Sequence, residues 1–144
     1  MKNNWMKWVL PGVAVLILDR LVKWAAENGL FFDALRGAIR NSGMAFGWFQ
    51  GKAGTILLFS LALVAVCLFL LRSTRISGLA PIALSLIAGG ALGNMIDRLA
   101  NGYVIDMFPF FGWFVFNVAD AGVVAGVALC AFSLLFRPQD WSKA

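Results

Sequence analysis

Apolar residues are gathered into four long blocks along the chain, with polar and glycine-rich segments between them. The blocks cover residues 8–26, 54–71, 79–97 and 118–136. A helix needs roughly 20 predominantly apolar residues to cross the hydrocarbon core of a bilayer, and each block has about that length. The pattern predicts an all-α integral membrane protein with a bundle of four transmembrane helices. We expect one domain over residues 1–144, with a small extracytoplasmic loop region that can include short β-strands.

The composition supports this fold class and excludes an ordinary soluble domain. Hydrophobic residues make up 61% of the chain and charged residues only 13%, whereas roughly half of the residues in soluble domains are apolar. Tryptophan rings favour the membrane interface. All six tryptophans lie at or just beyond the ends of the blocks, at Trp5, Trp8, Trp24, Trp48, Trp113 and Trp141.

The first block has one other interpretation, as a cleaved secretory signal peptide, because Lys2 and Lys7 precede an apolar stretch. A small-residue cleavage site does not follow that stretch. The charged residues Asp19, Arg20 and Lys23 follow instead, so we expect the block to be retained as a membrane span.

The chain contains no histidine and two cysteines. Without histidine, metal sites built on imidazole and triads that need an imidazole base are excluded. Cys67 and Cys130 lie deep inside the second and fourth blocks, where a thiol behaves as a small buried apolar group. We therefore expect no disulfide, no metal and no other cofactor.

Basic residues predict the orientation. The termini and the short segment between the second and third blocks carry Lys2, Lys7, Arg72, Arg75, Arg137 and Lys143. The longer connections at the opposite side carry Arg36, Arg40, Lys52 and Arg98. Since cytoplasmic loops are enriched in Lys and Arg, both termini are predicted to be cytoplasmic and the longer loops extracytoplasmic.

Acidic residues are distributed in the opposite way. Only Asp140 is on the predicted cytoplasmic side, and the other six are Asp19, Glu27, Asp33, Asp97, Asp106 and Asp120. The helix ends that carry Asp19, Asp97 and Asp120 share the outer leaflet, so these residues should converge there with Asp106. Ionisable residues inside a membrane span are costly and usually functional. For Asp19 and Lys23, one helical turn apart, a structural ion pair is an equally good interpretation.

The third block ends in AGGALGNMIDR, where Gly89 and Gly93 have the spacing that lets another helix approach closely. Asn94, Asp97 and Arg98 follow on one helical face. Asp97 can serve a catalytic site or form a structural ion pair with Arg98, and we favour the ion pair. In that interpretation Asn94 bonds across helices, while Arg98 fits either role.

The fourth block begins in FNVADAGVVAG, where Asn117 and Asp120 share a helical face and two glycines, Gly122 and Gly126, are again spaced for tight packing. No basic residue follows Asp120 before Arg137, so a purely local ion pair cannot explain this carboxylate, whereas a partner distant in the sequence could.

Asp106 lies in the apolar, aromatic segment GYVIDMFPFFGWFVF, where desolvation should raise the pKa of its carboxyl group. If Asp106 and Asp120 meet, repulsion between them would keep one proton on the pair near neutral pH. This is the acid and base arrangement of an aspartic protease, which needs neither a metal nor a covalent intermediate.

The segment IRNSGMAFGWF precedes the second block. Gly43 and Gly47 permit tight turns or close approach of the backbone, and the Asn41 side chain can bond a peptide backbone. An ordinary turn that leads into a membrane span explains the same pattern.

These motifs together resemble the lipoprotein signal peptidase family, also called signal peptidase II. The resemblance rests on LDRLVKW, NSGMAF, GGALGNMIDR, YVIDMF and FNVAD, which occur in the family's order over most of the chain. It implies a catalytic dyad of Asp106 and Asp120. It also implies substrate-binding or supporting roles for Asp19, Lys23, Asn41, Gly43, Asn94, Asp97, Arg98 and Asn117.

The resemblance further implies the substrate, a diacylglyceryl-modified prolipoprotein cut just before its lipidated cysteine at the outer face of the bacterial cytoplasmic membrane. Residues 29–51 and 108–116 would clamp over it, and globomycin-type depsipeptides would occupy the same cleft. We expect a monomer surrounded by membrane lipids that binds no nucleic acid. The sequence departs from the usual family pattern at Ser42, Met44, Met107 and Ala121, and no carboxylate is lost.

Three other functions fit intramembrane carboxylates less well. An ion-coupled transporter should have polar residues along its full depth, whereas residues 57–70 and 123–136 are almost wholly apolar. A magnesium-dependent phosphotransferase would face cytoplasmic nucleotides, and the predicted site faces outward. A purely structural membrane subunit would leave Asp106 and Asp120 unexplained.

Overall fold

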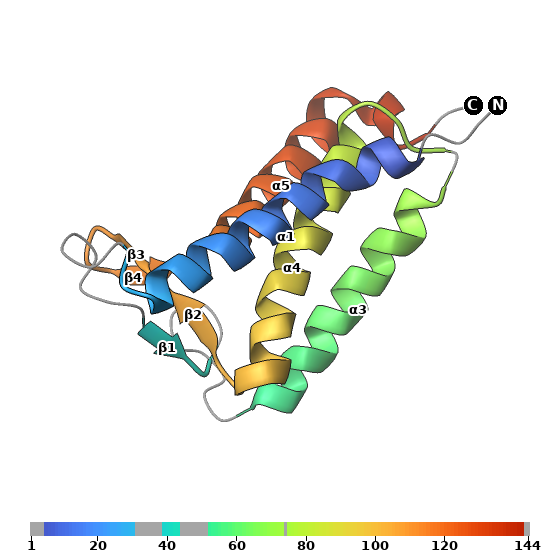
Figure 1. The fold of residues 1–144 in the computed structure, drawn as a ribbon. Coiled ribbons are helices and arrows are strands. Elements are labelled where there is room, and N and C mark those ends of the chain that lie inside the picture. The colour runs from blue at the N-terminus through green and yellow to red at the C-terminus, as the bar shows by residue number, and fades with distance from the viewer. Residues whose placement is uncertain (1–4, 31–38, 44–51, 74, 143–144) are drawn as a thin grey trace.

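The computed structural model describes residues 5–30, 39–43, 52–73 and 75–142. Four long helices form over the four apolar blocks (Figure 1). Their bounds are Trp5–Glu27 for α1, Ala53–Leu71 for α3, Leu79–Asn101 for α4 and Val118–Phe136 for α5. The prediction of a mostly helical membrane fold is confirmed.

Three of the four helices, α3, α4 and α5, are long and apolar enough to span a membrane by length and composition. The sequence predicted four such spans, and α1 differs because Asp19, Arg20 and Lys23 interrupt its apolar surface. Two of these side chains are fully buried in the bundle, Asp19 at 0% and Lys23 at 2% exposure. The charged groups of Asp19 and Lys23 therefore face protein partners rather than lipid.

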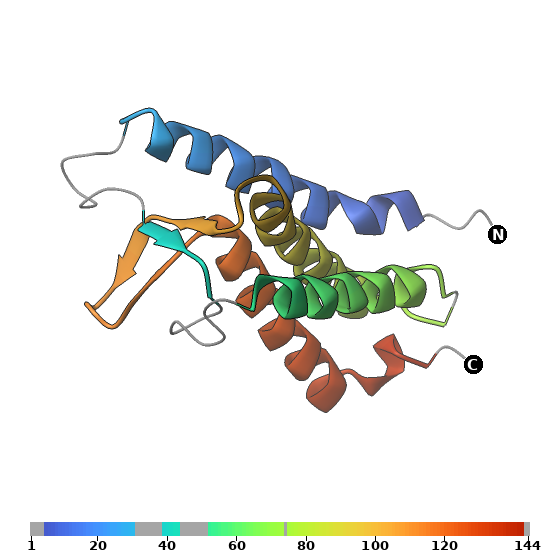
Figure 2. The ribbon, with the colours of Figure 1, turned by 90° about the horizontal axis from the view of Figure 1, so that it is seen from below.

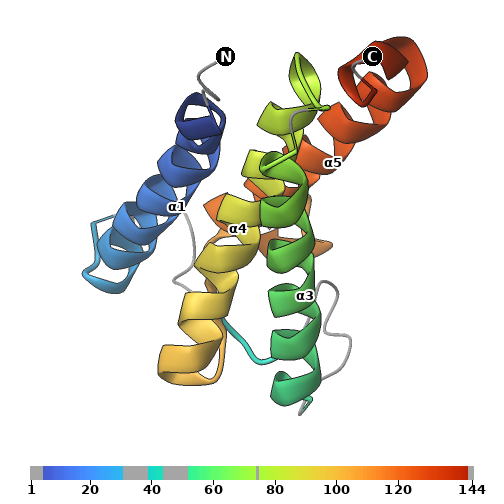
Figure 3. The ribbon, with the colours of Figure 1, turned by 90° about the vertical axis from the view of Figure 1, so that its right-hand side faces the viewer.

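Helix α4 is the centre of the bundle, and α1, α3 and α5 all pack against it (Figures 1 and 3). Glycines make the close contacts. A side chain at Gly89 would overlap the backbone carbonyl of Gly12 on α1, and a Cβ atom at Gly126 on α5 would lie 2.8 Å from the Ala83 carbonyl oxygen. The close helix packing predicted at both glycine pairs is confirmed. Only small residues allow these backbones to approach.

Helix α4 runs one turn further than the predicted span and ends at Asn101. Gly102 follows with a left-handed φ of 79°, and its N–H donates to the Arg98 carbonyl. A glycine in this conformation is the usual helix terminator because it has no Cβ to clash. Arg98 therefore lies within α4 and not in the loop after it.

Four short strands lie together at the end of the bundle where α1 ends and α5 begins (Figures 1 and 2), which we call the strand end. β1 (Ile39–Asn41) pairs antiparallel with β2 (Val104–Asp106), with Ile39 opposite Asp106. β3 (Phe108–Phe110) and β4 (Phe114–Phe116) form an antiparallel hairpin. The Met107 N–H donates to the Phe116 carbonyl over 3.1 Å and joins the hairpin to β2.

The opposite end of the bundle holds the termini and a short 3-10 helix, η2 (Pro138–Asp140) (Figure 1). The buried Asp140 carboxylate accepts a hydrogen bond from the Leu79 N–H over 2.9 Å, at the first residue of α4. The Ser77 N–H donates to the Asp140 carbonyl over 2.8 Å. Asp140, placed on the cytoplasmic side by the sequence pattern, thus caps α4 and ties the C-terminal segment to it.

Candidate active site

Asp106 and Asp120 belong to different elements, and Asn117 connects them. The Asn117 side-chain amide donates to the Asp106 carboxylate over 2.6 Å. The Asn117 backbone N–H donates to the Asp120 carboxylate over 3.2 Å, and the Asp120 N–H donates back to the Asn117 side chain over 2.8 Å. This reciprocal pair is a capping box at the start of α5. The cap of the helix therefore also orients both carboxylates.

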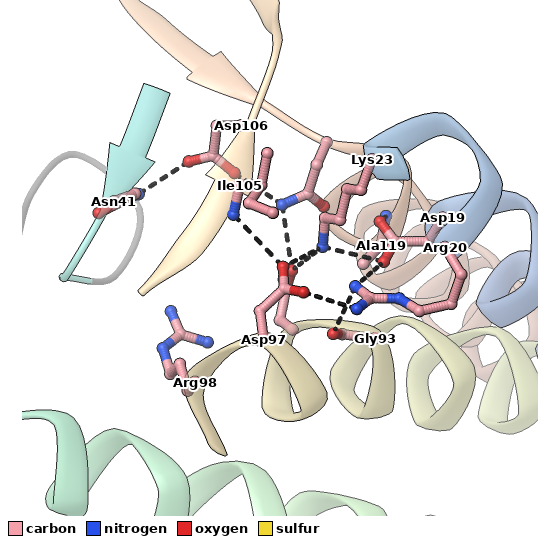
Figure 4. Close-up of polar contacts among 12 residues, drawn as sticks. Asp19, Arg20, Lys23, Asn41, Gly93, Asp97, Arg98, Ile105, Asp106 and Ala119 are labelled. Carbon is pink, nitrogen blue, oxygen red and sulfur yellow. Dashed lines mark hydrogen bonds and ion pairs between the residues drawn. The ribbon is translucent and has the colours of Figure 1, made fainter. Parts of the chain in front are cut away.

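Asp106 is the last residue of β2 and is 2% exposed. Its second carboxylate oxygen accepts a hydrogen bond from the Asn41 amide over 2.9 Å (Figure 4). Burial raises the pKa of Asp106 to about 6, and repulsion by Asp120 adds to the rise. The hydrogen bonds from Asn41 and Asn117 oppose the rise and hold the pKa of Asp106 below what burial alone would give. The raised pKa predicted from the apolar sequence around Asp106 is confirmed.

Asp120 lies in the first turn of α5 and is bonded by amides. Besides the Asn117 backbone, the Asn94 side chain donates to its carboxylate over 2.7 Å. The Asn94 carbonyl oxygen in turn accepts from the Asn117 amide over 3.0 Å and from the Lys23 ammonium over 3.2 Å. Asn94 therefore bonds across helices as predicted, and it relays contact from the Lys23 cation to Asp120.

An ion-pair cluster lies near Asp106, with Lys23 at its centre (Figure 4). The Lys23 ammonium contacts the Asp19 carboxylate at 2.9 Å and the Asp97 carboxylate at 2.7 Å. With Asn94 as its third acceptor, all three of its N–H bonds have partners. Three acceptors compensate for the loss of hydration of this buried cation.

Arg20 belongs to the same cluster, although it was not among the site residues predicted from the sequence. Its guanidinium contacts Asp97 at 2.6 Å and Asp19 at 2.7 Å, and it donates to the Gly93 carbonyl over 3.0 Å. The signal was present in the sequence, since Arg20 is an ionisable residue inside an apolar block and adjoins Asp19.

One expectation from the sequence needs correction, namely the structural ion pair between Asp97 and Arg98. Asp97 pairs with Arg20 and Lys23 instead. Asp97 and Arg98 are neighbours on α4, so their side chains leave the helix about 100° apart. Asp97 does form structural ion pairs, as favoured from the sequence, but with other partners than Arg98.

The cluster also fixes the two segments that carry the carboxylates. Asp19 accepts a hydrogen bond from the Ala119 N–H over 2.9 Å, next to Asp120. Asp97 accepts one from the Ile105 N–H over 3.3 Å, next to Asp106. The predicted convergence of the outer acidic residues is therefore present, with Asp19 and Asp97 as anchors of the backbone.

Arg98 points away from this cluster (Figure 4). Its guanidinium donates to the Gly43 carbonyl over 2.8 Å, and the Gly43 N–H donates to the Asn41 side chain over 2.9 Å. Arg98 thus ties the segment after β1 to α4, and its charge attracts Asp106 and Asp120. Gly47 and most of the predicted clamp at residues 29–51 lie outside the described residues.

The described part of the chain contains no group of three or more His, Cys, Asp or Glu side chains that could hold a metal. The site offers two carboxylates that are both bonded by Asn117, further amide donors on each, and a cation one contact further away. A pair of this kind can hold one proton, accept a proton from water and donate one to a carbonyl oxygen.

Comparison with known proteins gives concordant results. The family described as signal peptidase (SPase) II matches residues 12–136. A lipoprotein signal peptidase of Rhodopseudomonas palustris is 39% identical over a gapped alignment of 152 positions, which covers 88% of this chain and 90% of the relative. One of Fusobacterium nucleatum is 41% identical and covers 91% and 87%. A solved structure described as a bacterial membrane enzyme superposes with a TM-score of 0.81 at 25% identity and covers 96% of this chain and 93% of the other.

Proposed function

Because the chain belongs to the signal peptidase II family of aspartic peptidases, we propose that it removes signal peptides from diacylglyceryl-modified prolipoproteins. Cleavage falls just before the lipidated cysteine. The chain is a bacterial multi-pass membrane protein, so a lipid-anchored substrate reaches it by diffusion in the bilayer. The observation that carries this proposal is the Asn117 bridge, in which one residue donates hydrogen bonds to both the Asp106 and the Asp120 carboxylates.

The reaction is a hydrolysis that uses one proton shared by the pair. The ionised carboxylate takes a proton from water as the water oxygen attacks the scissile carbonyl carbon, and the protonated carboxyl donates its proton to the carbonyl oxygen. Collapse of the tetrahedral intermediate breaks the C–N bond. The amine leaving group takes a proton from the carboxyl that accepted it from water. As the C=O bond re-forms, the hydroxyl made on the former carbonyl oxygen returns its proton to the other carboxylate, so the pair again holds one proton.

The environments of the two carboxylates favour different roles. Asp120 lies at the N-terminus of α5, where the helix dipole favours a negative charge. Asp106 is buried on a strand, with a pKa raised to about 6. Asp120 is accordingly the base that activates water, and Asp106 carries the proton that polarises the carbonyl group.

The other residues of the site act on these two. Asn94 and Asn117 orient Asp120 and Asp106, and Asn41 donates to Asp106. Asp19 and Asp97 are positioning residues, because they accept hydrogen bonds from the backbone beside Asp120 and Asp106. Arg20 and Lys23 pair with these two carboxylates and act through them. Arg98 and Gly43 hold the segment after β1 near the site, where it can contact the substrate.

The strand end faces the outside of the cytoplasmic membrane, in agreement with the basic residues at the opposite end. The protein works as a monomer and needs no metal. Globomycin-type depsipeptides bind in the same place as the substrate, and a competition experiment with the lipidated substrate tests this part of the proposal.

The central test follows cleavage of a lipidated prolipoprotein by gel shift in liposomes, with Asp106→Asn and Asp120→Asn beside the wild type. Each variant should lose nearly all activity, and a chelator should leave the wild type active. Glu27→Gln is the matched control, since Glu27 is an exposed carboxylate at the same end of the bundle. Activity retained in both dyad variants, or absent from the folded wild type, contradicts the proposal.

A further inference from the structure

The β3–β4 hairpin exposes large aromatic side chains at its tip. Phe111 is 85% exposed and Trp113 is 83% exposed, the two highest values among the large hydrophobic residues described. The hairpin projects away from the helices at the strand end (Figure 2). Its other aromatic rings pack on one another, with Phe108 against Phe116 at 5.6 Å and Phe110 against Phe114 at 5.1 Å. Phe111 also contacts the Phe110 ring edge-on, with 4.8 Å between the ring centroids, but this contact leaves the tip mostly exposed.

The turn holds the tip in this exposed form. The Trp113 N–H donates to the Phe110 carbonyl over 2.9 Å and closes the turn. Phe111 has a φ of 48° and Gly112 a φ of 76°. A left-handed φ is unusual for a bulky residue, so the backbone adopts an unfavourable conformation that presents the Phe111 ring outward. Exposure of two large apolar rings to water is unfavourable because of the hydrophobic effect.

The surroundings of the tip are those of a membrane interface. No charged residue occurs between Asp106 and Asp120, so nothing in the hairpin opposes entry into the headgroup region. At the same end of the bundle Trp24 on α1 is 59% exposed and Leu99 on α4 is 68% exposed. Trp side chains favour the membrane interface. Exposed apolar side chains of the helices and of the hairpin thus occur at the same end of the bundle.

We propose that residues 110–113 form a membrane anchor, in which the Phe111 and Trp113 side chains insert into the interfacial region of the lipid leaflet at the strand end. The anchor is connected to the site by a short segment. Strand β3 begins at Phe108, two residues after Asp106, and the Met107 N–H donates to the Phe116 carbonyl at the base of the hairpin. Insertion of the tip therefore fixes the depth of Asp106 relative to the bilayer. This inference concerns lipid contact without substrate and does not depend on the proposed hydrolysis.

The test measures the depth of the tip by electron paramagnetic resonance. A nitroxide is attached to Trp113→Cys in a background of Cys67→Ala and Cys130→Ala, and the protein is placed in phosphatidylcholine and phosphatidylglycerol liposomes without substrate. We expect the label to collide more with oxygen, which concentrates in lipid, than with a water-soluble nickel chelate. A label at Trp24→Cys provides the lipid reference, and one at Arg75→Cys, in the exposed loop at the other end, provides the water reference.

A label that collides mainly with the nickel chelate overturns the proposal and indicates a tip that waits in water for the substrate. Spectral broadening that grows with the ratio of protein to lipid also overturns it and indicates contact with a second copy. As a second measurement that leaves the native cysteines in place, Trp113→Phe should remove a component of tryptophan fluorescence that brominated phospholipids quench. If the component removed is quenched by iodide instead, the anchor is wrong.

Discussion

The Asn117 amide donates to the Asp106 carboxylate over 2.6 Å, although one residue caps a helix and the other ends a strand. Asn117 also caps α5 with its carbonyl oxygen, so one side chain uses both ends of its amide. Helix capping and orientation of the site are therefore coupled in this residue, and substitution can separate them.

Asn117→Ser tests this separation. Serine is a good helix cap but has no amide to reach Asp106, so we expect α5 to remain capped while kcat falls about 100-fold through misplacement of the carboxylate. Asn117→Ala should lose the cap as well, with about 1 kcal/mol less stability. Gel-shift kinetics and thermal unfolding in detergent measure the two effects. Equal activity in Asn117→Ser and wild type would show that the contact is dispensable.

The pKa of Asp106 predicts the alkaline limb of the pH profile. The pKa of Asp106 is about 6, so its carboxyl holds the proton at lower pH and loses it at higher pH. We therefore expect kcat/KM to fall as the pH rises through the pKa of Asp106. The Asn41 hydrogen bond lowers the pKa of Asp106. Asn41→Ala should therefore move the alkaline limb to higher pH, while Glu27→Gln leaves it in place. A limb that moves to lower pH in Asn41→Ala would contradict the assignment of the proton to Asp106.

Lys23→Met should lower the stability of the folded protein, although methionine is the more apolar side chain. The substitution leaves the buried carboxylates of Asp19 and Asp97 with only Arg20 as a cationic partner. Breaking a buried ion pair on one side costs about 3–5 kcal/mol. Thermal unfolding in detergent should show the loss, with the exposed Arg72→Met as a control near the wild type. An unchanged melting temperature would mean that the cluster adds little to stability.

Gly89→Ala tests the contact between α1 and α4. The added methyl group would meet the Gly12 carbonyl, so the helices must separate. Overpacking of this kind costs about 1–3 kcal/mol. Gly54→Ala is the matched control, because a Cβ atom at Gly54 in the first turn of α3 has open space around it. Comparable melting temperatures for the two variants would refute the close approach of the backbones.

The helices and the meeting of the acidic residues could be predicted because they depend on length and sidedness alone. An apolar block of about 20 residues predicts a span, and the parity of the spans places Asp19, Asp97 and Asp120 at one end. These inferences need no knowledge of how each helix is rotated about its axis.

The pairings within the site depend on how each helix is rotated about its axis, and the pattern of apolar and polar residues does not predict this rotation. Arg98 is adjacent to Asp97 along the chain, yet Arg20 of another helix binds Asp97. The pairing of β1 with β2 likewise joins segments more than 60 residues apart, as the contact between Asn41 and Asp106 shows. Such contacts arise from tertiary packing, which local periodicity does not report.

The distribution of the site over the chain has a consequence for biosynthesis. Lys23 is made early, Asn94 and Asp106 later, and Asp120 belongs to the last long helix described. The ribosome makes the chain from its N-terminus, so the paired carboxylates cannot exist until α5 has entered the membrane and packed on α4. Under the proposed function, a partly synthesised chain that lacks α5 has no paired carboxylates and therefore cannot cut the membrane proteins inserted beside it. The order of synthesis itself would then delay hydrolysis.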